Sequence, residues 1–268
     1  MKSIVMPMRF AGAAAVLLVP TAVAYAQSHD DADHAHGYYA PGTPIFEDFV
    51  LGPTSPGKWG PPAMGTGATV TWSIMPAGVS MGGEGYGNTV SMDSVMPGGY
   101  FAAIQAAFAA WSAVANITFQ YVTPDNGAAF DAQNTSANIR IGAHPMDGGG
   151  GTLAHGYYPP SNGFSAAGDI HFDSGDTWKI GFGGGGFDVF QVAAHEIGHA
   201  IGLNHTAVSL SLMNPFYTEA FSGPQADDIA GARFIYGAPI EVPEASTWVA
   251  GFSLVVGGLG VWRTRRQS

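Results

Sequence analysis

One stretch of the chain predicts a helix and a metal site together: His195-Glu196-Ile197-Gly198-His199-Ala200-Ile201-Gly202-Leu203-Asn204-His205. Residues four apart share one face of a helix, so the imidazoles of His195 and His199 would converge on one point. Gly202 can take the positive φ that ends a helix, and the chain could then return so that His205 supplies a third nitrogen. Three neutral imidazoles suit zinc and leave one position open, as in catalytic sites. Glu196 would lie beside the metal as the general base.

A methionine-containing turn follows this stretch, with the sequence Ser211-Leu212-Met213-Asn214-Pro215. The two motifs resemble the metzincin zinc endopeptidases, and their spacing resembles that of the matrixin branch. The resemblance implies that Met213 packs beneath the catalytic zinc without binding it, and that Pro215 and Tyr217 wall the main specificity pocket. It also implies that Glu196 activates water for attack on a peptide bond.

The resemblance further implies an α+β architecture, the metzincin fold. This is a twisted, mostly parallel five-stranded sheet with one antiparallel edge strand, an N-terminal core helix, the active-site helix and a C-terminal helix. The sequence pattern agrees, because period-2 and β-branched runs predict strands and a helical apolar repeat predicts the core helix. The predicted strands are 69–74, 117–122 and 138–142, the core helix is 100–114, and the later helices begin near Asp188 and span 224–237.

Leu153 and Ala154 are expected on the antiparallel edge strand over the cleft. An exposed strand edge can bind an extended peptide through main-chain hydrogen bonds, which positions a peptide bond without demanding a particular sequence. These two residues are therefore predicted to bind substrate.

A region rich in glycine and aspartate predicts a hard-cation site, although a solvated turn would carry the same composition. The matrixin resemblance implies that calcium is bound there by three carboxylates and three carbonyl groups, and that one further acid belongs to a second calcium site. The carboxylates are Asp147, Asp173 and Asp176, the carbonyls belong to Gly148, Gly150 and Thr152, and the further acid is Asp169.

Two histidines, His155 and His171, match half of the structural zinc site of matrixins. In register, the other two ligand positions fall on Arg140 and Gly142, neither of which suits zinc. His144 could substitute if the intervening loop shifts. We therefore expect a second zinc to be weakly bound or absent.

The chain is expected to begin with a signal peptide, because residues 1–26 place Lys2 and Arg9 before an apolar run and a small-x-small cleavage site. A membrane anchor is the alternative interpretation. Residues 27–57 are polar and rich in His, Asp, Pro and Gly, which predicts a flexible segment, with metal scavenging or occlusion of the active site as alternatives. Residues 58–238 are expected to form the matrixin-like domain.

The C-terminal part, 239–268, is expected to contain a linker at 239–247 and a transmembrane helix with a basic tail at 248–268. The linker carries Pro243-Glu244-Ala245, and the whole arrangement resembles the PEP-CTERM sorting tail of Gram-negative bacteria. That resemblance implies processing by an exosortase, whereas a plain C-terminal anchor is the alternative.

Charge and cysteine content narrow the function further. The chain has 9 basic and 20 acidic residues, and five of the basic ones lie in the two ends: Lys2, Arg9, Arg263, Arg265 and Arg266. An acidic body argues against nucleic acid as a partner. The chain has no cysteine, so disulfides cannot stabilise it and no thiolate can cap the zinc.

The sequence thus predicts a zinc-dependent endopeptidase exported from a Gram-negative bacterium, secreted or held at the cell surface. Its expected partners are a protein or peptide substrate, signal peptidase, an exosortase and, through the C-terminal helix, the membrane. Two other functions stay open: a non-catalytic, metal-stabilised surface binding module displayed through the sorting tail, and hydrolysis of a small amide.

Overall fold

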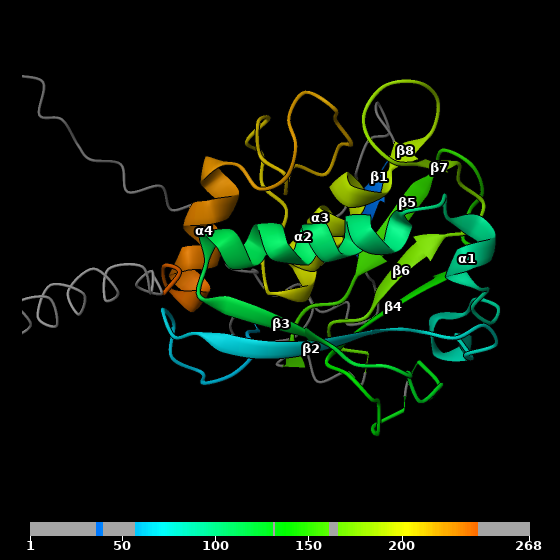
Figure 1. Cartoon of the computed structure of the whole chain (residues 1–268), viewed down its shortest axis with the longest axis horizontal. Helices are drawn as coiled ribbons and strands as arrows, with labels where there is room; N and C mark the ends of the chain where they lie inside the picture. Colours follow the sequence, from blue (N-terminus) through cyan, green and yellow to red (C-terminus); the bar gives the residue numbers. More distant parts are fainter. Residues whose placement is uncertain (1–35, 40–56, 131, 161–165, 241–268) are drawn as a thin grey trace, which may run out of the picture. The chain divides into compact units, whose positions relative to one another are not determined.

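The computed structural model describes residues 36–39, 57–130, 132–160 and 166–240 (Figure 1). The chain divides into two compact units, 1–238 and 239–268, and the fold below is that of the first. In the described ranges, no helix has both the length and the apolar character needed to cross a membrane. The predicted signal peptide, sorting motif and C-terminal helix lie outside the described residues.

The sheet confirms the predicted arrangement of five strands. They lie in the order β5-β6-β4-β2-β3, and every neighbouring pair is parallel except β5 with β6. Their bounds are Ala68–Ile74 for β2, Ile117–Tyr121 for β3, Ile139–His144 for β4, Thr152–Gly156 for β5 and Ile170–Asp173 for β6. A sixth strand, β1 (His36–Tyr39), was not predicted and pairs antiparallel with β5.

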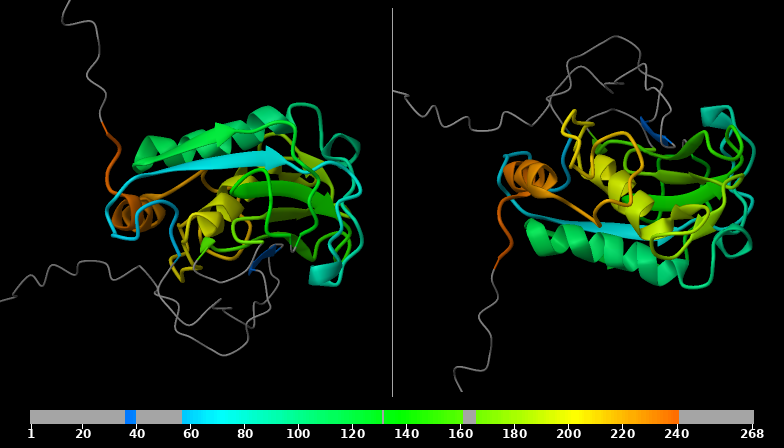
Figure 2. Two further views of the ribbon diagram at one scale, coloured as in Figure 1. Left: turned by 90° about the horizontal axis from the view of Figure 1, so that it is seen from below. Right: turned by 90° about the horizontal axis from the view of Figure 1, so that it is seen from above.

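Helices and short strands complete the domain. They are η1 (Gly82–Glu84), α1 (Met92–Val95), α2 (Tyr100–Val114), β7 (Trp178–Lys179), β8 (Phe187–Asp188), α3 (Val189–Ala200) and α4 (Ala226–Tyr236). α2 has the predicted bounds and packs against α3, while α3 also contacts β5 and β6. α4 lies at one end of the domain and α1 at the other (Figures 1 and 2).

The main core fixes the active-site helix to the rest of the domain. Trp111 of α2 is fully buried, and its indole Nε1 donates a hydrogen bond of 2.9 Å to the carbonyl oxygen of Ala194 in α3. Phe108, one turn earlier on α2, packs on Trp72 of β2 with ring centroids 4.6 Å apart. Burying each such side chain contributes about 1.5–3 kcal/mol. α2 thus links the sheet to α3.

A second, smaller core lies beneath the loop that joins β2 to α1. Its members are Met75, Val79, Met81, Phe130, Tyr157 and Ala166. The loop is also tied by its backbone, because the Phe130 amide donates to the Ser80 carbonyl at 3.0 Å and the Glu84 amide to the Met81 carbonyl at 3.0 Å. This packing gives the short helix η1 a defined position.

Candidate functional site

The two ends of α3 determine where its histidines lie. At the start, the Asp188 side chain accepts a hydrogen bond from the Gln191 amide at 2.9 Å, which satisfies a free helix donor. At the end, Gly202 has φ of 104°, and the amides of Gly202 and Leu203 donate to the last helical carbonyls at 2.8 and 2.9 Å. The chain therefore reverses and brings His205 back to the helix.

Three histidine nitrogens meet at this reversal. Nε2 of His205 lies 3.2 Å from Nε2 of His195 and 3.2 Å from Nε2 of His199. All three residues are buried. Tetrahedral zinc with ordinary Zn–N bonds separates its nitrogen ligands by about 3.3 Å. The structure thus brings together the three residues that the sequence predicted as zinc ligands.

The hydrogen bonds of Nδ1 in His195 and His199 show which nitrogen of each imidazole could bind a metal. Nδ1 of His195 lies 2.6 Å from the Leu212 carbonyl oxygen, and Nδ1 of His199 lies 2.8 Å from the Leu203 carbonyl oxygen. A carbonyl only accepts, so each Nδ1 carries the proton and each Nε2 presents its lone pair. Burial, with His199 nearby, also lowers the pKa of His195 well below its usual range. Neutral imidazoles aimed at one point are the donor set that zinc requires.

The methionine turn is held from α4 by a buried carboxylate. Asp228 accepts hydrogen bonds from the amides of Leu212 and Met213, at 2.7 and 3.0 Å, and from the Ser211 hydroxyl. The Leu212 carbonyl in turn orients His195. Sequence reasoning assigned Asp228 only to the closing helix, because its partners lie 15 to 17 residues away. Asp228 therefore supports His195 indirectly, through the methionine turn.

Gly198 allows Met213 to pack directly beneath α3. A Cβ at position 198 would collide with the Met213 sulfur and would lie 3.1 Å from the Trp111 ring. Met213 is 2% exposed, as expected for a side chain that packs under the histidines. The glycine between the two helical histidines is thus required by packing.

Glu196 lies on the same helix next to His195 and is fully buried. Within the described part of the chain, neither of its carboxylate oxygens has a hydrogen-bond partner. Burial raises the pKa of this carboxyl well above its usual range. A carboxylate of raised basicity, free of internal hydrogen bonds, is suited to accept a proton from water.

A second cluster of side chains that could hold a metal ion includes His155 of β5. It consists of Glu84, His144, His155 and His171, whose ligand atoms all lie within 4.8 Å of one another. Oε1 of Glu84 lies 2.8 Å from Nε2 of His155 and 2.9 Å from Nδ1 of His171, and Oε2 lies 3.1 Å from Nε2 of His144. His144, the predicted substitute, therefore lies beside His155 and His171, and Glu84 adds a fourth donor that the sequence did not predict.

Glu84 was not found by sequence reasoning, because it lies 60 residues before His144 in a loop without a motif. The small number of glutamates was one signal that could have drawn attention to it, because residues 58–238 contain only three: Glu84, Glu196 and Glu219. The fully buried side chain of Met81 and the hydrogen bonds of the loop carry Glu84 to the cluster, where its side chain is only 6% exposed.

The geometry of this cluster fits a metal better than internal pairing. Glu84 Oε2 and His144 Nε2 are buried and close, yet they lack the alignment of a hydrogen bond. Nδ1 of His144 lies 3.1 Å from the Pro145 carbonyl, so its Nε2 presents a lone pair. Burial would raise the pKa of the Glu84 carboxyl, but the imidazoles of His171, His155 and His144 hold it well below its usual range. One carboxylate and three imidazoles make a four-ligand donor set of the structural zinc type.

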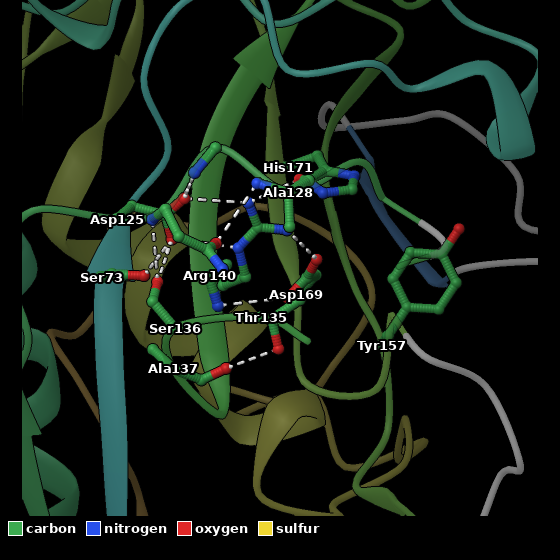
Figure 3. Close-up of polar contacts among 12 residues, drawn as sticks. Ser73, Asp125, Ala128, Thr135, Ser136, Ala137, Arg140, Tyr157, Asp169 and His171 are labelled. Atoms are coloured by element: carbon green, nitrogen blue, oxygen red, sulfur yellow. Dashed lines mark hydrogen bonds and ion pairs between the residues drawn. The ribbon is translucent and has the colours of Figure 1, made fainter. Parts of the chain in front are cut away.

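Arg140, at one of the register positions expected for a zinc ligand, instead forms a buried ion-pair network (Figure 3). Its Nε and Nη2 donate to the two carboxylate oxygens of Asp125 at 3.0 and 2.9 Å, and Nη1 lies 3.8 Å from Oδ2 of Asp169. The Arg140 amide also donates to Asp169 at 3.2 Å. A calcium ion at Asp169 would share that carboxylate with a fixed positive charge, so we do not propose the predicted second calcium site.

Replacing Asp125 by alanine is expected to destabilise the domain by ~3–5 kcal/mol, because it leaves the fully buried Arg140 without its bidentate partner. Burial would raise the pKa of Asp125, but hydrogen bonds from Arg140 and Ser73 lower it to about 2. Asp125 is therefore charged at neutral pH. Urea unfolding at saturating zinc and calcium measures the loss. The matched control is Asp93→Ala, on an exposed residue, expected to change stability by less than about 0.5 kcal/mol. Equal midpoints for the two variants would contradict the assignment.

The predicted calcium acids occupy two adjoining loops. Asp173 accepts hydrogen bonds from the amides of Met146, Gly148 and Gly175, and Asp147 accepts from the Thr152 amide. Burial raises the pKa of Asp176 to about 6, and the nearby charges of Asp173 and Asp147 also raise it. A hydrogen bond from the Gly150 amide acts in the opposite direction and lowers this pKa. The repulsion between these like charges would be relieved by a bound cation, although these acids are not among the convergent groups found in the described residues.

The predicted substrate-binding residues lie on two sides of the histidines. Leu153 and Ala154 are on β5, which contacts α3. Pro215 and Tyr217 follow the methionine turn, and the Tyr217 hydroxyl accepts from the Asp188 amide at 2.9 Å and donates to Glu219 at 2.6 Å. Glu219 also accepts from the Gly183 amide and forms an ion pair with Lys179, at 2.6 and 2.5 Å. The Tyr217 segment is thereby tied to the glycine-rich loop before α3.

The sequence of this chain is similar to those of known proteins. Residues 91–237 match the family model of the matrixins, peptidase family M10, over more than half of the chain. Karilysin of Tannerella forsythia is 39% identical over 145 residues, which cover 54% of this chain and 30% of that protein. Stromelysin-3 of Xenopus laevis is 49% identical over 96 residues, covering 35% and 19%, respectively. Matrix metalloproteinase-16 of Homo sapiens is 40% identical over 152 residues, covering 53% and 24%.

The shared region thus spans less than a third of each of these relatives. The likeness concerns one domain, the part of the chain that contains both histidine clusters.

Proposed function

Because this chain belongs to the matrixin family of zinc metalloproteases, we propose that it is an endopeptidase that hydrolyses internal peptide bonds of proteins, with Glu196 as the general base. The observation that supports this most directly is the convergence of three buried imidazoles beside a buried carboxylate. A non-catalytic binding module would tolerate loss of a ligand or of the base, and this chain retains all of them.

Each part of the site has a role in the proposed reaction. The main chain of β5 binds an extended peptide, and the segment of Pro215 and Tyr217 contacts the side chain that follows the cleaved bond. His195, His199 and His205 would hold zinc, which would supply the Lewis acidity that acidifies water and polarises the peptide carbonyl. Glu196 accepts the proton of the attacking water and delivers it to the leaving amine.

Two further metals belong to the proposal as structural ions. The cluster of Glu84, His144, His155 and His171 would hold a second zinc, which ties the loop of η1 to β4, β5 and β6. Calcium at Asp147, Asp173 and Asp176, with the carbonyls of Gly148, Gly150 and Thr152, would neutralise the close carboxylates. In a chain without cysteine, bound metals take the place that disulfides hold in many exported proteins.

The same proposal places the protein outside the cell, on the basis of the signal-peptide pattern of residues 1–26. Signal peptidase would remove that segment. The resemblance of residues 239–268 to a sorting tail carries the further proposal of surface retention or exosortase processing in a Gram-negative host.

The test is cleavage of a quenched peptide library and of an unfolded protein by the full chain at neutral pH with zinc and calcium. We expect products from internal peptide bonds, complete loss of turnover after chelation and recovery when zinc is restored. Mass spectrometry of the products gives the preference at the specificity pocket. A chain that holds zinc at the three histidines but cuts neither substrate would contradict the proposal.

A further inference from the structure

Two consecutive tyrosines, Tyr157 and Tyr158, directly follow β5. Side chains of an extended strand point alternately to its two sides, and the end of β5 shows this alternation. His155 belongs to the second cluster, whereas Gly156 faces α3, because an added Cβ there would lie 3.1 Å from Oε2 of Glu196. The two tyrosines continue the alternation, and each of them reaches a different histidine cluster.

Tyr157 contacts the second cluster. Its hydroxyl donates a hydrogen bond of 2.6 Å to Oε1 of Glu84, and its ring centroid lies 5.7 Å from that of His155. The backbone is fixed as well, because the Tyr157 amide donates to the Asp169 carbonyl at 2.9 Å and the Gly168 amide donates to the Tyr157 carbonyl at 3.1 Å. The side chain is buried, so its position depends on that of Glu84.

Tyr158 contacts the other cluster, the three-histidine cluster of His195, His199 and His205. Its hydroxyl donates to Oδ1 of Asn204 at 2.8 Å, and the same oxygen accepts a hydrogen bond from the His205 amide at 2.7 Å. The Tyr158 ring also packs edge-to-face on that of His199, with centroids 5.8 Å apart. His205 is the member of this cluster that lies outside α3, so its position depends on the loop that carries it. Tyr158 therefore helps to hold the third nitrogen donor in place.

We propose that Tyr157 and Tyr158 are positioning residues that couple the two clusters, so that an ion in the second cluster raises the affinity of the three-histidine cluster for zinc. This inference rests on the metal sites of the proposed function. An ion in the second cluster would fix Glu84, which in turn restrains Tyr157. Because the peptide unit between the tyrosines is planar, restraint of one also limits the other. Tyr158 then restrains His205 through Asn204.

The expected gain in affinity comes from ordering a ligand before the metal arrives. A site binds more tightly when its donors are already in place, because less conformational entropy is lost on binding. Two donors of the three-histidine cluster lie on one helix, so the loop of the third is the part that such ordering can change. Thermodynamic linkage makes the effect mutual, since zinc at either cluster would raise the affinity of the other by the same factor.

The experiment is a calorimetric titration of the metal-free full chain with zinc, in buffer that contains calcium. Two dissociation constants are expected, and the variants His144→Ala and His205→Ala assign one to each cluster. The test variants are Tyr157→Phe and Tyr158→Phe, which keep the ring and remove only the hydroxyl. The matched control is Tyr121→Phe, the same change on an exposed side chain of β3, at the edge of the sheet away from β5.

We expect Tyr157→Phe to weaken zinc binding at the three-histidine cluster about fivefold, although the hydroxyl that it removes donates to Glu84 of the second cluster. Tyr158→Phe should have a similar effect, and Tyr121→Phe should have none. His144→Ala, which disables the second cluster, should also weaken the three-histidine cluster about fivefold, and adding Tyr157→Phe should change it by less than about twofold more. Excess zinc would still fill the site.

An unchanged constant for the three-histidine cluster in Tyr157→Phe would overturn the inference, and so would effects of Tyr157→Phe and His144→Ala that multiply. If Tyr157→Phe does not fold, His144→Ala decides: weaker zinc binding at the three histidines supports the coupling, and equal binding overturns it. A chain that binds zinc only at the three histidines would overturn the coupling and leave the peptidase intact. None of these readouts needs peptide cleavage, so failure of the proposed function would be seen separately.

Discussion

Replacing Glu196 by glutamine is expected to lower kcat by about a hundredfold to ten-thousandfold while zinc stays bound. The amide has nearly the shape of the carboxylate but cannot accept a proton from water. The three histidines keep their orientation, because their outer nitrogens are held by Leu212 and Leu203 and not by Glu196. Steady-state cleavage of the library-selected peptide, beside zinc content per chain, gives the two readouts.

The matched control for this variant is Glu219→Gln, the same chemical change on a side chain that is 26% exposed. Its kcat should stay within about twofold of the parent, because Glu219 contacts Tyr217 and Lys179 and none of the zinc ligands. Parental turnover by the Glu196 variant would rule out the assigned base. Loss of zinc from it would show that the residue supports the metal instead.

Replacing Glu84 by glutamine is expected to reduce bound zinc from two ions to one per chain and to lower stability. The substitution removes the only negative ligand of the second cluster, and an amide is a poor ligand for zinc beside three neutral imidazoles. At free zinc about 100 times the dissociation constant of the site, the parent gains about 2.7 kcal/mol of stability from that ion, and the variant loses this gain. Urea unfolding at buffered zinc and elemental analysis measure the two effects.

His144→Ala provides an independent version of the same test, because it removes a ligand from β4 and leaves the loop of η1 unaltered. Both variants should lose the same ion and keep peptidase activity at temperatures at which they are folded. The isosteric control is again Glu219→Gln. Two tightly bound zinc ions in either variant would contradict the assignment of that residue as a ligand.

Local spacing explains why the catalytic residues could be found from the sequence. His195 and His199 are one helical turn apart, so any α-helix through them aligns their rings, and Gly202 supplies the backbone freedom for the reversal. The apolar repeat of α2 is equally local, and its bounds, Tyr100–Val114, were predicted without error. Secretion, the sorting tail and the bound calcium remain predictions.

Long-range contacts explain what was missed. The second cluster draws its four ligands from η1, β4, β5 and β6, and His155 faces His171 only because β5 and β6 are antiparallel in that register. Counting along the chain placed Arg140 at a ligand position that it does not suit, and the fold turns Arg140 toward Asp125 and brings Glu84 to the cluster. A one-residue change of register would reverse such assignments, since alternate residues of a strand face opposite sides.

The sequence by itself therefore predicted the helix α3, the convergence of its two histidines with His205 and the family, because the motif that carries them spans only a few residues. Only the tertiary structure decided that Glu84 lies beside three histidines, that Asp228 holds the methionine turn and that β1 pairs with β5. Those contacts join segments far apart in the chain, and their geometry is set by strand register and core packing.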